Sequence, residues 1–164
     1  MSSKPYKVLF VCSGNSGRSI MAESILTKLG DGRFDAHSAG SHPTWRINPF
    51  ALDVLWRRGY RTDALASKSW NEFSRFDAPG LDFVIAVCDK AAAEPQPYWP
   101  GRPITITWTI PSPDAVQGTD GEVRAVFESV CDQIEAALRA FVALPLEALD
   151  ANATRALLAE IARA

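Results

Sequence analysis

A cysteine, five residues and an arginine stand between an apolar run and a helical stretch near the N-terminus. Cys12 begins this segment, Arg18 closes it, and Ser19 follows. The residues between them are glycine or small and polar: Ser13, Gly14, Asn15, Ser16 and Gly17. Glycines allow a turn whose successive N–H groups point inward as an anion nest, and the following helix adds its unpaired N-terminal donors. The segment therefore predicts a loop that binds a tetrahedral oxyanion.

The side chains of this loop also suit nucleophilic attack. The planar guanidinium of Arg18 can hold two oxygens of a phosphate-like anion. Positive charge and a helix N-terminus favour the thiolate of Cys12, which is the nucleophilic form. The hydroxyl of Ser19 can donate to that sulfur, and Asn15 can brace the loop. The alternative, a buried structural cysteine beside a coincidental arginine, is disfavoured because the strand, loop and helix patterns agree.

The bulk properties of the chain favour one ordinary globular domain. We expect it to span residues 1–164, with 146–164 as a C-terminal helical extension. Seventeen basic residues against nineteen acidic ones, with no long basic run, give no sign of a nucleic-acid partner. No apolar stretch is long enough to span a membrane, and the N-terminus lacks a secretory signal. Three cysteines then predict reduced thiols and a cytoplasmic location.

Strand and helix patterns alternate along the chain. Apolar or β-branched runs predict strands at 7–12, 34–38, 81–88 and 103–108, the last at an edge. Helical periodicity predicts helices at 19–29, 48–59, from 121 onward, and from 147 toward the C-terminus. Such alternation implies a parallel sheet with helices on both faces. Ligands of such sheets bind beyond the carboxyl ends of the strands, where Cys12 and Cys88 both lie.

Six segments carry a resemblance to a known family. VLFVCSGNSGRSIMAES resembles the signature of the low-molecular-weight protein tyrosine phosphatase superfamily. Its arsenate reductase branch is resembled by HSAGSHP at 37–43, INPFALDVL at 47–55, SKSWNEF at 67–73, DFVIAVCDKAAAE at 82–94 and YWPG at 98–101. The resemblance runs to about Leu149. It implies an α/β three-layer sandwich with a four-stranded parallel sheet.

The resemblance implies a role for each cysteine of the site. In the phosphatases the loop cysteine attacks phosphorus, and in the reductases it attacks arsenate. A second cysteine then attacks the adduct, which releases arsenite and leaves a disulfide. Cys12, Arg18 and Ser19 match the shared loop, and Cys88 matches the second cysteine. Gln96 stands where the thioredoxin-linked enzymes have a third cysteine, so a relay of three cysteines is not available.

Two routes of reduction remain open without a third cysteine. Cys88 can attack Cys12, and an external thiol protein such as thioredoxin can open the disulfide. Otherwise a small thiol, such as glutathione with glutaredoxin or mycothiol, attacks the Cys12 adduct directly. Cys88 would then be a core residue at a strand end. Cys131 lies in the apolar-rich helix and is interpreted as a packing residue.

The proton donor of the family is altered in this chain. The family carries Asp-Pro in the loop after the fourth strand, and Ser112 occupies the place of that aspartate. A serine hydroxyl cannot deliver a proton near neutral pH as a carboxylic acid can. Asp114, two residues later, can serve if the loop is shifted, or it can cap a turn.

The sequence leads to one expectation about metal ions bound by histidine and to another about potassium. His37 and His42 show no ligand spacing, so we expect no metal site. Asn15, Glu23 and Ser38 match positions that bind potassium in some related reductases, which implies potassium as a candidate cofactor.

The sequence thus predicts an arsenate reductase that converts arsenate to arsenite with an external thiol reductant. A low-molecular-weight phosphatase that hydrolyses phosphate monoesters through a phosphocysteine is the first alternative. An oxyanion-binding protein with an eroded active site is the second, because the acid and the third cysteine are missing.

Overall fold

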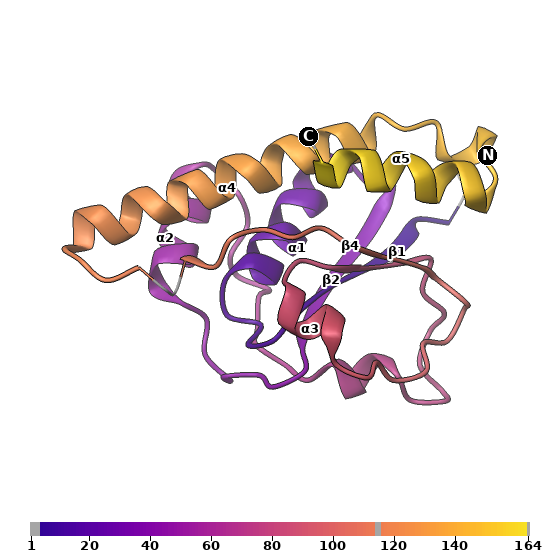
Figure 1. The fold of residues 1–164 in the computed structure, drawn as a ribbon, viewed down its shortest axis with the longest axis horizontal. Coiled ribbons are helices and arrows are strands. Elements are labelled where there is room, and N and C mark those ends of the chain that lie inside the picture. The colour runs from indigo at the N-terminus through magenta and orange to yellow at the C-terminus, as the bar shows by residue number, and fades with distance from the viewer. Residues whose placement is uncertain (1–3, 114–115, 164) are drawn as a thin grey trace.

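A sheet of four parallel strands, in the order β2-β1-β3-β4, forms the centre of the computed structural model, which describes residues 4–113 and 116–163 (Figure 1). The strands are β1 (Tyr6–Cys12), β2 (Phe34–Gly40), β3 (Phe83–Ala86) and β4 (Ile104–Thr107). The α-helices are α1 (Arg18–Leu29), α2 (Pro49–Arg57), α3 (Asp89–Ala93), α4 (Asp120–Val142) and α5 (Ala151–Arg163). Two 3-10 helices are η1 (Trp70–Phe73) and η3 (Leu146–Ala148). The expected architecture, a four-stranded parallel α/β sandwich, is confirmed.

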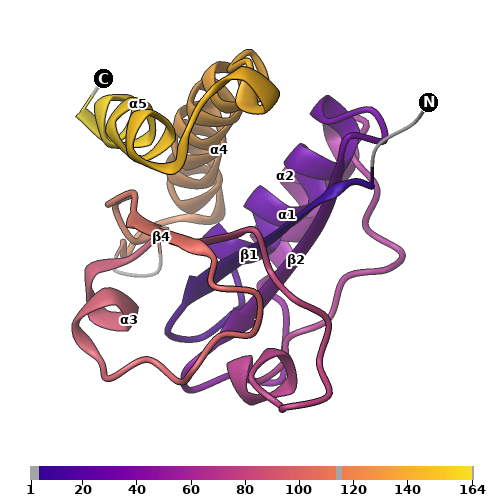
Figure 2. The ribbon, with the colours of Figure 1, turned by 90° about the vertical axis from the view of Figure 1, so that its right-hand side faces the viewer.

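Both faces of the sheet are buried because the strands carry apolar side chains on both faces. Val8, Phe10 and Cys12 of β1 belong to the larger core cluster, to which α1, α2 and α4 contribute (Figure 2). Leu9 and Val11 face a smaller cluster that contains tryptophans from η1 and from the loop before β4. Period-two alternation in a strand sends successive side chains to opposite faces. β1 is therefore a central strand, and packing on both of its faces holds its last residue, Cys12, in place.

The carboxyl ends of β1, β3 and β4 are joined by backbone hydrogen bonds. The amide of Val87 donates to the carbonyl of Val11 at 2.9 Å, and the amide of Trp108 donates to the carbonyl of Ala86 at 2.7 Å. The residues after each strand therefore meet at one edge of the sheet, where an oxyanion loop was predicted.

Most element boundaries lie within about two residues of the sequence prediction, but two elements depart from it in ways that affect the site or the C-terminal helix. The strand predicted at 81–88 ends at Ala86, and Cys88 is instead the N-cap of α3. The helix predicted from 147 is split, because Leu149 is extended and the carboxylate of Asp150 accepts a hydrogen bond from the amide of Ala153 at 2.7 Å. A side-chain acceptor of this kind starts a new helix, here α5.

The last helix packs on the edge of the sheet and on α4. The indole Nε1 of Trp108 donates to the carbonyl of Leu158 at 3.0 Å, and both residues are buried. Among the described residues, no helix has the length and apolar character needed to cross a bilayer.

Shortening a buried side chain of α5 should measure how firmly this helix is attached. We expect Leu158→Ala to lower the free energy of unfolding by about 2–4 kcal/mol, because Leu158 is fully buried. Leu157→Ala, at a half-buried position, is the matched control and should cost less. Urea denaturation compares the two variants. Equal small losses in both would mean that α5 does not pack on the sheet in solution.

Candidate active site

The loop between β1 and α1 holds its carbonyl groups away from the sulfur of Cys12. Four loop carbonyls accept from amides of the segment 41–48: Cys12 from Ser41 at 3.2 Å, Ser13 from His42 at 2.8 Å, Gly14 from Thr44 at 3.0 Å and Ser16 from Asn48 at 2.8 Å. In a trans peptide unit the N–H points opposite to the C=O, so the amides that follow these carbonyls face the other way. The amide of Asn15 donates to Cys12 Sγ at 3.2 Å. The loop is therefore a candidate anion nest beside the sulfur.

The residue that turns this loop is Asn15, which is left-handed at a φ of 47°. Neither Gly14 nor Gly17 has a positive φ, so the left-handed residue of the loop is an asparagine and not a glycine. Asparagine is one of the few residues other than glycine that enter this region readily. A different glycine proves indispensable: a Cβ on Gly40 would lie 2.5 Å from the carbonyl oxygen of Ser13. Gly40 lets β2 approach the loop, and the sequence analysis gave it no role.

A chain of hydrogen bonds runs from the backbone of Lys68 to the sulfur of Cys12. The amide of Lys68 donates to Asn15 Oδ1 at 2.9 Å, which fixes the orientation of the Asn15 amide group. Asn15 Nδ2 then donates to Ser19 Oγ at 2.8 Å. Since Ser19 Oγ accepts this bond, its own hydrogen is free for Cys12 Sγ, 2.9 Å away. Asn15 and Ser19 are fully buried, so the donor to the sulfur is held in place.

The N-terminus of α1 keeps its positive end free for an anion. Gly17 is the N-cap and provides no side-chain acceptor, and the first turn contains no acidic residue. The amide donors there are therefore not consumed by a side-chain cap. Arg18 begins this helix, and its Nη1 donates to the carbonyl of Ile110 at 2.7 Å. Ile110 follows β4, so the loop after that strand orients the guanidinium beside the nest.

Replacing Arg18 by lysine should separate charge from geometry. A lysine keeps the charge but loses the planar fork that can reach both Ile110 and an oxyanion. We expect Arg18→Lys to reduce kcat/KM for an oxyanion substrate by about 10²-fold. Arg46→Lys, in the exposed loop before α2, is the matched control for an arginine-to-lysine substitution as such. Steady-state kinetics compare the two, and an unchanged kcat/KM for Arg18→Lys would contradict this use of the guanidinium.

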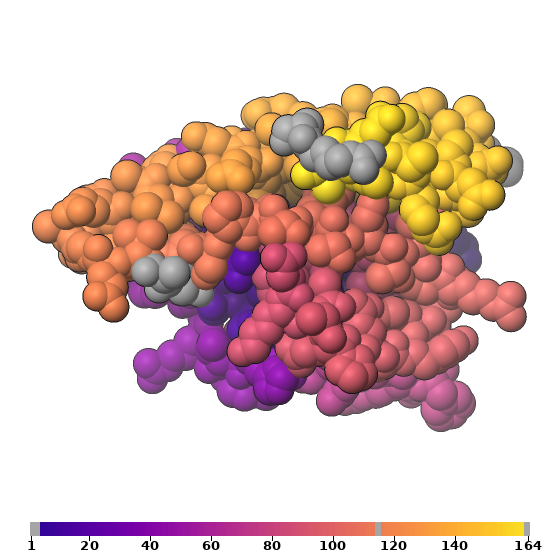
Figure 3. All heavy atoms as spheres, in the orientation of Figure 1, coloured from indigo at the N-terminus to yellow at the C-terminus, as the bar shows by residue number. Residues whose placement is uncertain are grey.

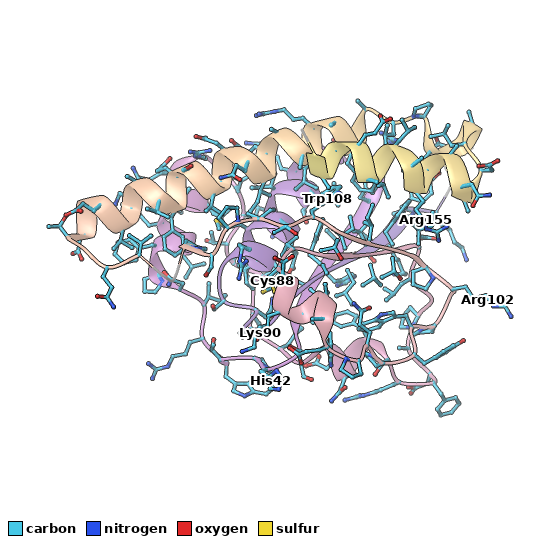
Figure 4. The ribbon with its side chains drawn as sticks, viewed as in Figure 1. His42, Cys88, Lys90, Arg102, Trp108 and Arg155 are labelled. Carbon is cyan, nitrogen blue, oxygen red and sulfur yellow. The ribbon has the colours of Figure 1, made fainter. Side chains whose placement is uncertain are left out.

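Cys88 lies at the start of α3, two residues after the end of β3 (Figure 4). It belongs to the same core cluster as Cys12 and is 3% exposed. Its sulfur accepts a long hydrogen bond from the amide of Ala91 at 3.4 Å. Other contacts tie α3 down: Thr109 donates to the carboxylate of Asp89 at 2.7 Å, and the carboxylate of Glu94 accepts from a serine hydroxyl at 2.9 Å. Cys88 is thus near the carboxyl end of β3. Because α3 covers its thiol, an external protein cannot reach the thiol unless α3 shifts.

The structure describes only one of the two positions considered for the proton donor, Ser112 and Asp114. Ser112 is exposed, two residues after Ile110, so it lies in the loop that orients Arg18. Asp114 lies outside the described residues, and its role stays a prediction. The exposed carboxylate of Asp89, next to Cys88, is a further acid at this edge that the sequence analysis did not single out.

Cys131 is buried in the core on α4. Burial raises the pKa of its thiol to about 12, so the thiol is neutral at physiological pH. This agrees with its interpretation as a packing residue.

The site lies in a hollow of the surface. Figure 3 shows atoms of the N-terminal segment, in indigo, at the bottom of a depression beside the pink atoms of α3. The loop, Arg18 and Cys88 are therefore a candidate anion site with two thiols and a helix N-terminus, an arrangement that suits attack on a tetrahedral oxyanion.

Comparison with known proteins places the chain in a family. A model of the low molecular weight phosphotyrosine protein phosphatase family matches residues 7–156. The chain belongs to this family. Among its relatives, a glutaredoxin arsenate reductase of Synechocystis sp. is 30% identical over 129 residues, which cover 79% of this chain and 90% of the relative. An arsenate reductase of Halalkalibacterium halodurans is 33% identical over 135 residues, with 82% and 93% covered.

A solved structure of the family has a similar backbone. An arsenate reductase in the phosphate binding state superposes with a TM-score of 0.65 at 28% identity and covers 84% of this chain and 97% of that one. The resemblance to the arsenate reductase branch of the low molecular weight phosphatases is therefore confirmed at the level of sequence and fold.

Proposed function

We propose that this protein is an arsenate reductase in which Cys12 is the nucleophile and Cys88 the resolving thiol. The observation that carries the proposal is the pair of thiols after two neighbouring strands. Cys12 ends β1, and Cys88 follows β3, which is bonded to β1 just beyond its end, where the amide of Val87 donates to the carbonyl of Val11. A phosphatase requires the first thiol but has no use for the second. The relatives named as arsenate reductases support arsenate as the substrate.

The first step is attack by the Cys12 thiolate on the arsenic of arsenate. An S–As bond forms, and one oxygen leaves as water after it takes up a proton from an acid at the site. Asp114 and Asp89 are the candidate donors. Arg18 and the nest amides hold the remaining oxygens and stabilise their charge, as preorganised donors do in oxyanion sites.

The second step is attack by the Cys88 thiolate on Cys12 Sγ. An S–S bond forms, the S–As bond breaks, and its electron pair stays on arsenic, which leaves as arsenite. Arsenic is reduced by two electrons, and the two thiols are oxidised to a disulfide. The hydroxyl of Ser19 donates to Cys12 Sγ and stabilises it both as nucleophile and as leaving group.

An external thiol must then reduce this disulfide, because Gln96 cannot act as a third cysteine. Its side chain is held by the indole of Trp99, whose Nε1 donates to Gln96 Oε1 at 3.0 Å. The name of the Synechocystis relative supports a glutaredoxin with glutathione, while thioredoxin and mycothiol remain to be compared. Free thiols of this kind require a reducing compartment, so we place the activity in the cytoplasm.

Arsenite formation from arsenate tests the proposal. Purified protein is supplied in parallel with thioredoxin, with glutaredoxin plus glutathione, and with a mycothiol system. We expect turnover with at least one of them. If a separate sample shows that Cys12 of the folded protein reacts with iodoacetamide, no turnover of the untreated protein with any of the three systems would contradict the proposal.

Phosphate monoester hydrolysis is the second candidate, and one side chain favours it. Trp45 is 66% exposed, with a left-handed φ of 63°. Its amide donates to Ser67 Oγ at 3.2 Å, and that hydroxyl donates to the carbonyl of Gly14 at 3.3 Å. The backbone of Trp45 is thus tied to the loop through Ser67, and its exposed ring is a candidate to stack on an aryl ester. Hydrolysis of p-nitrophenyl phosphate without thiol, in the absence of arsenite formation, would favour this candidate; oxyanion binding alone would leave an eroded binding protein.

A further inference from the structure

The residues matched to a potassium site lie next to a cation that the chain supplies itself. Ser38 Oγ donates to Glu23 Oε1 at 2.5 Å, which joins β2 to α1. The ammonium of Lys68 donates to the carbonyl of Ser38 at 3.1 Å and to that of Ala66 at 2.8 Å. Asn15, the third matched residue, accepts from the backbone of the same lysine. The cluster thus already contains a fixed positive charge.

These residues do not fit a resident potassium ion. A hard cation needs several oxygens that converge on one point. Here the carbonyls of Ser38 and Ala66 are already bound by the ammonium of Lys68, which occupies the place that such an ion would need. A second cation at this place would also be repelled by Lys68.

The electrostatics of the cluster give the lysine a task. Glu23 follows Ser19 by one turn of α1, so both residues lie on the same face of the helix. Burial raises the pKa of the Glu23 carboxyl, whereas the Ser38 hydrogen bond and the Lys68 ammonium act in the opposite direction. A carboxylate close to the nest disfavours a thiolate, and a neighbouring cation offsets that effect.

We propose that Lys68 is a positioning residue whose ammonium is the built-in monovalent cation of the site, which makes the reactivity of Cys12 independent of potassium. The inference rests on the proposed function only in taking Cys12 as the reactive thiol. Lys68 acts both through its backbone and through its side chain. Its backbone amide orients Asn15 and Ser19, and its side chain balances Glu23 and holds β2.

The rate of alkylation of Cys12 by iodoacetamide tests this role. The rate is followed by mass spectrometry of the Cys12 peptide, at one pH and ionic strength, in potassium, sodium or choline chloride. We expect the wild-type rate to be the same in all three salts. Lys68→Ala should slow alkylation by about tenfold in sodium or choline chloride, and potassium should restore the rate because the deleted ammonium leaves room for it.

Two further variants make the test specific. Lys68→Met keeps the aliphatic stem, so it should be slow in all three salts, because no space opens for potassium. Lys90→Met removes a lysine from the exposed face of the neighbouring α3 and should react as the wild type does (Figure 4). Both Lys68 variants keep the backbone bonds to Asn15 and Gly40.

The opposite results would overturn the inference. They are a wild-type rate that rises in potassium chloride, or Lys68 variants that react like the wild type in every salt. Alkylation requires no arsenate, so its outcome is separate from the proposed function. A protein that shows the predicted salt pattern but forms no arsenite would retain the role of Lys68 and lose the reductase assignment.

Discussion

Cys12→Ser is expected to abolish arsenite formation, with a loss of about 10⁴-fold or more. A serine hydroxyl in the same nest is not ionised near neutral pH, so the donors around it have no anionic nucleophile to present. The variant should still fold and bind phosphate, because the nest amides and Arg18 are untouched. Arsenite assays and phosphate titration measure the two properties side by side.

Cys131→Ala is the matched control for this prediction. It also removes one thiol, but from the interior of α4, so it should keep full turnover with some loss of stability. A Cys12→Ser variant with wild-type turnover would exclude Cys12 as the nucleophile. Loss of phosphate binding in that variant would instead indicate a disturbed loop.

Cys88→Ser is expected to separate the two chemistries of the site. Arsenite formation with a thiol protein should fall by about 10²-fold or more, because nothing within the chain can break the S–As bond. Hydrolysis of p-nitrophenyl phosphate should stay close to the wild-type rate, since a phosphocysteine is released by water. Parallel assays of the two substrates check this contrast.

The same variant decides between the two routes of reduction. If arsenite formation persists with a small thiol, that thiol attacks the Cys12 adduct directly, and Cys88 is a core residue. If both activities fall together, the change has disturbed the cap of α3 rather than a redox step. Far-ultraviolet circular dichroism and phosphate binding distinguish such damage from a chemical effect.

The parts of the fold that the sequence predicted are those specified by nearby residues. The runs at β1 and β4 are contiguous, and each fixes a strand without reference to distant residues. The segment from Cys12 to Ser19 is likewise contiguous, so its strand, loop and helix could be recognised together. Cys88 was correctly expected at the carboxyl ends of the strands. The residue at which its own strand ends could not be predicted, since it depends on pairing with β4, which is four residues long.

The parts that the sequence did not predict depend on contacts between distant segments. Lys68 lies 53 positions from Asn15, and the carbonyl of Ile110 lies 92 positions from Arg18. Neither residue type suggests its task, since a loop lysine and an apolar residue after a strand are common. Gly40 could have been suspected beside the nest, but only the close approach of Ser13 shows why a side chain cannot be accommodated there.

A single turnover of the fully reduced protein with arsenate, without any added reductant, tests the central claim most directly. We predict that arsenite is released in proportion to protein, and that peptide mapping finds one disulfide between Cys12 and Cys88 while Cys131 stays reduced. Arsenite release with all three thiols still free, or a disulfide that includes Cys131, would contradict it.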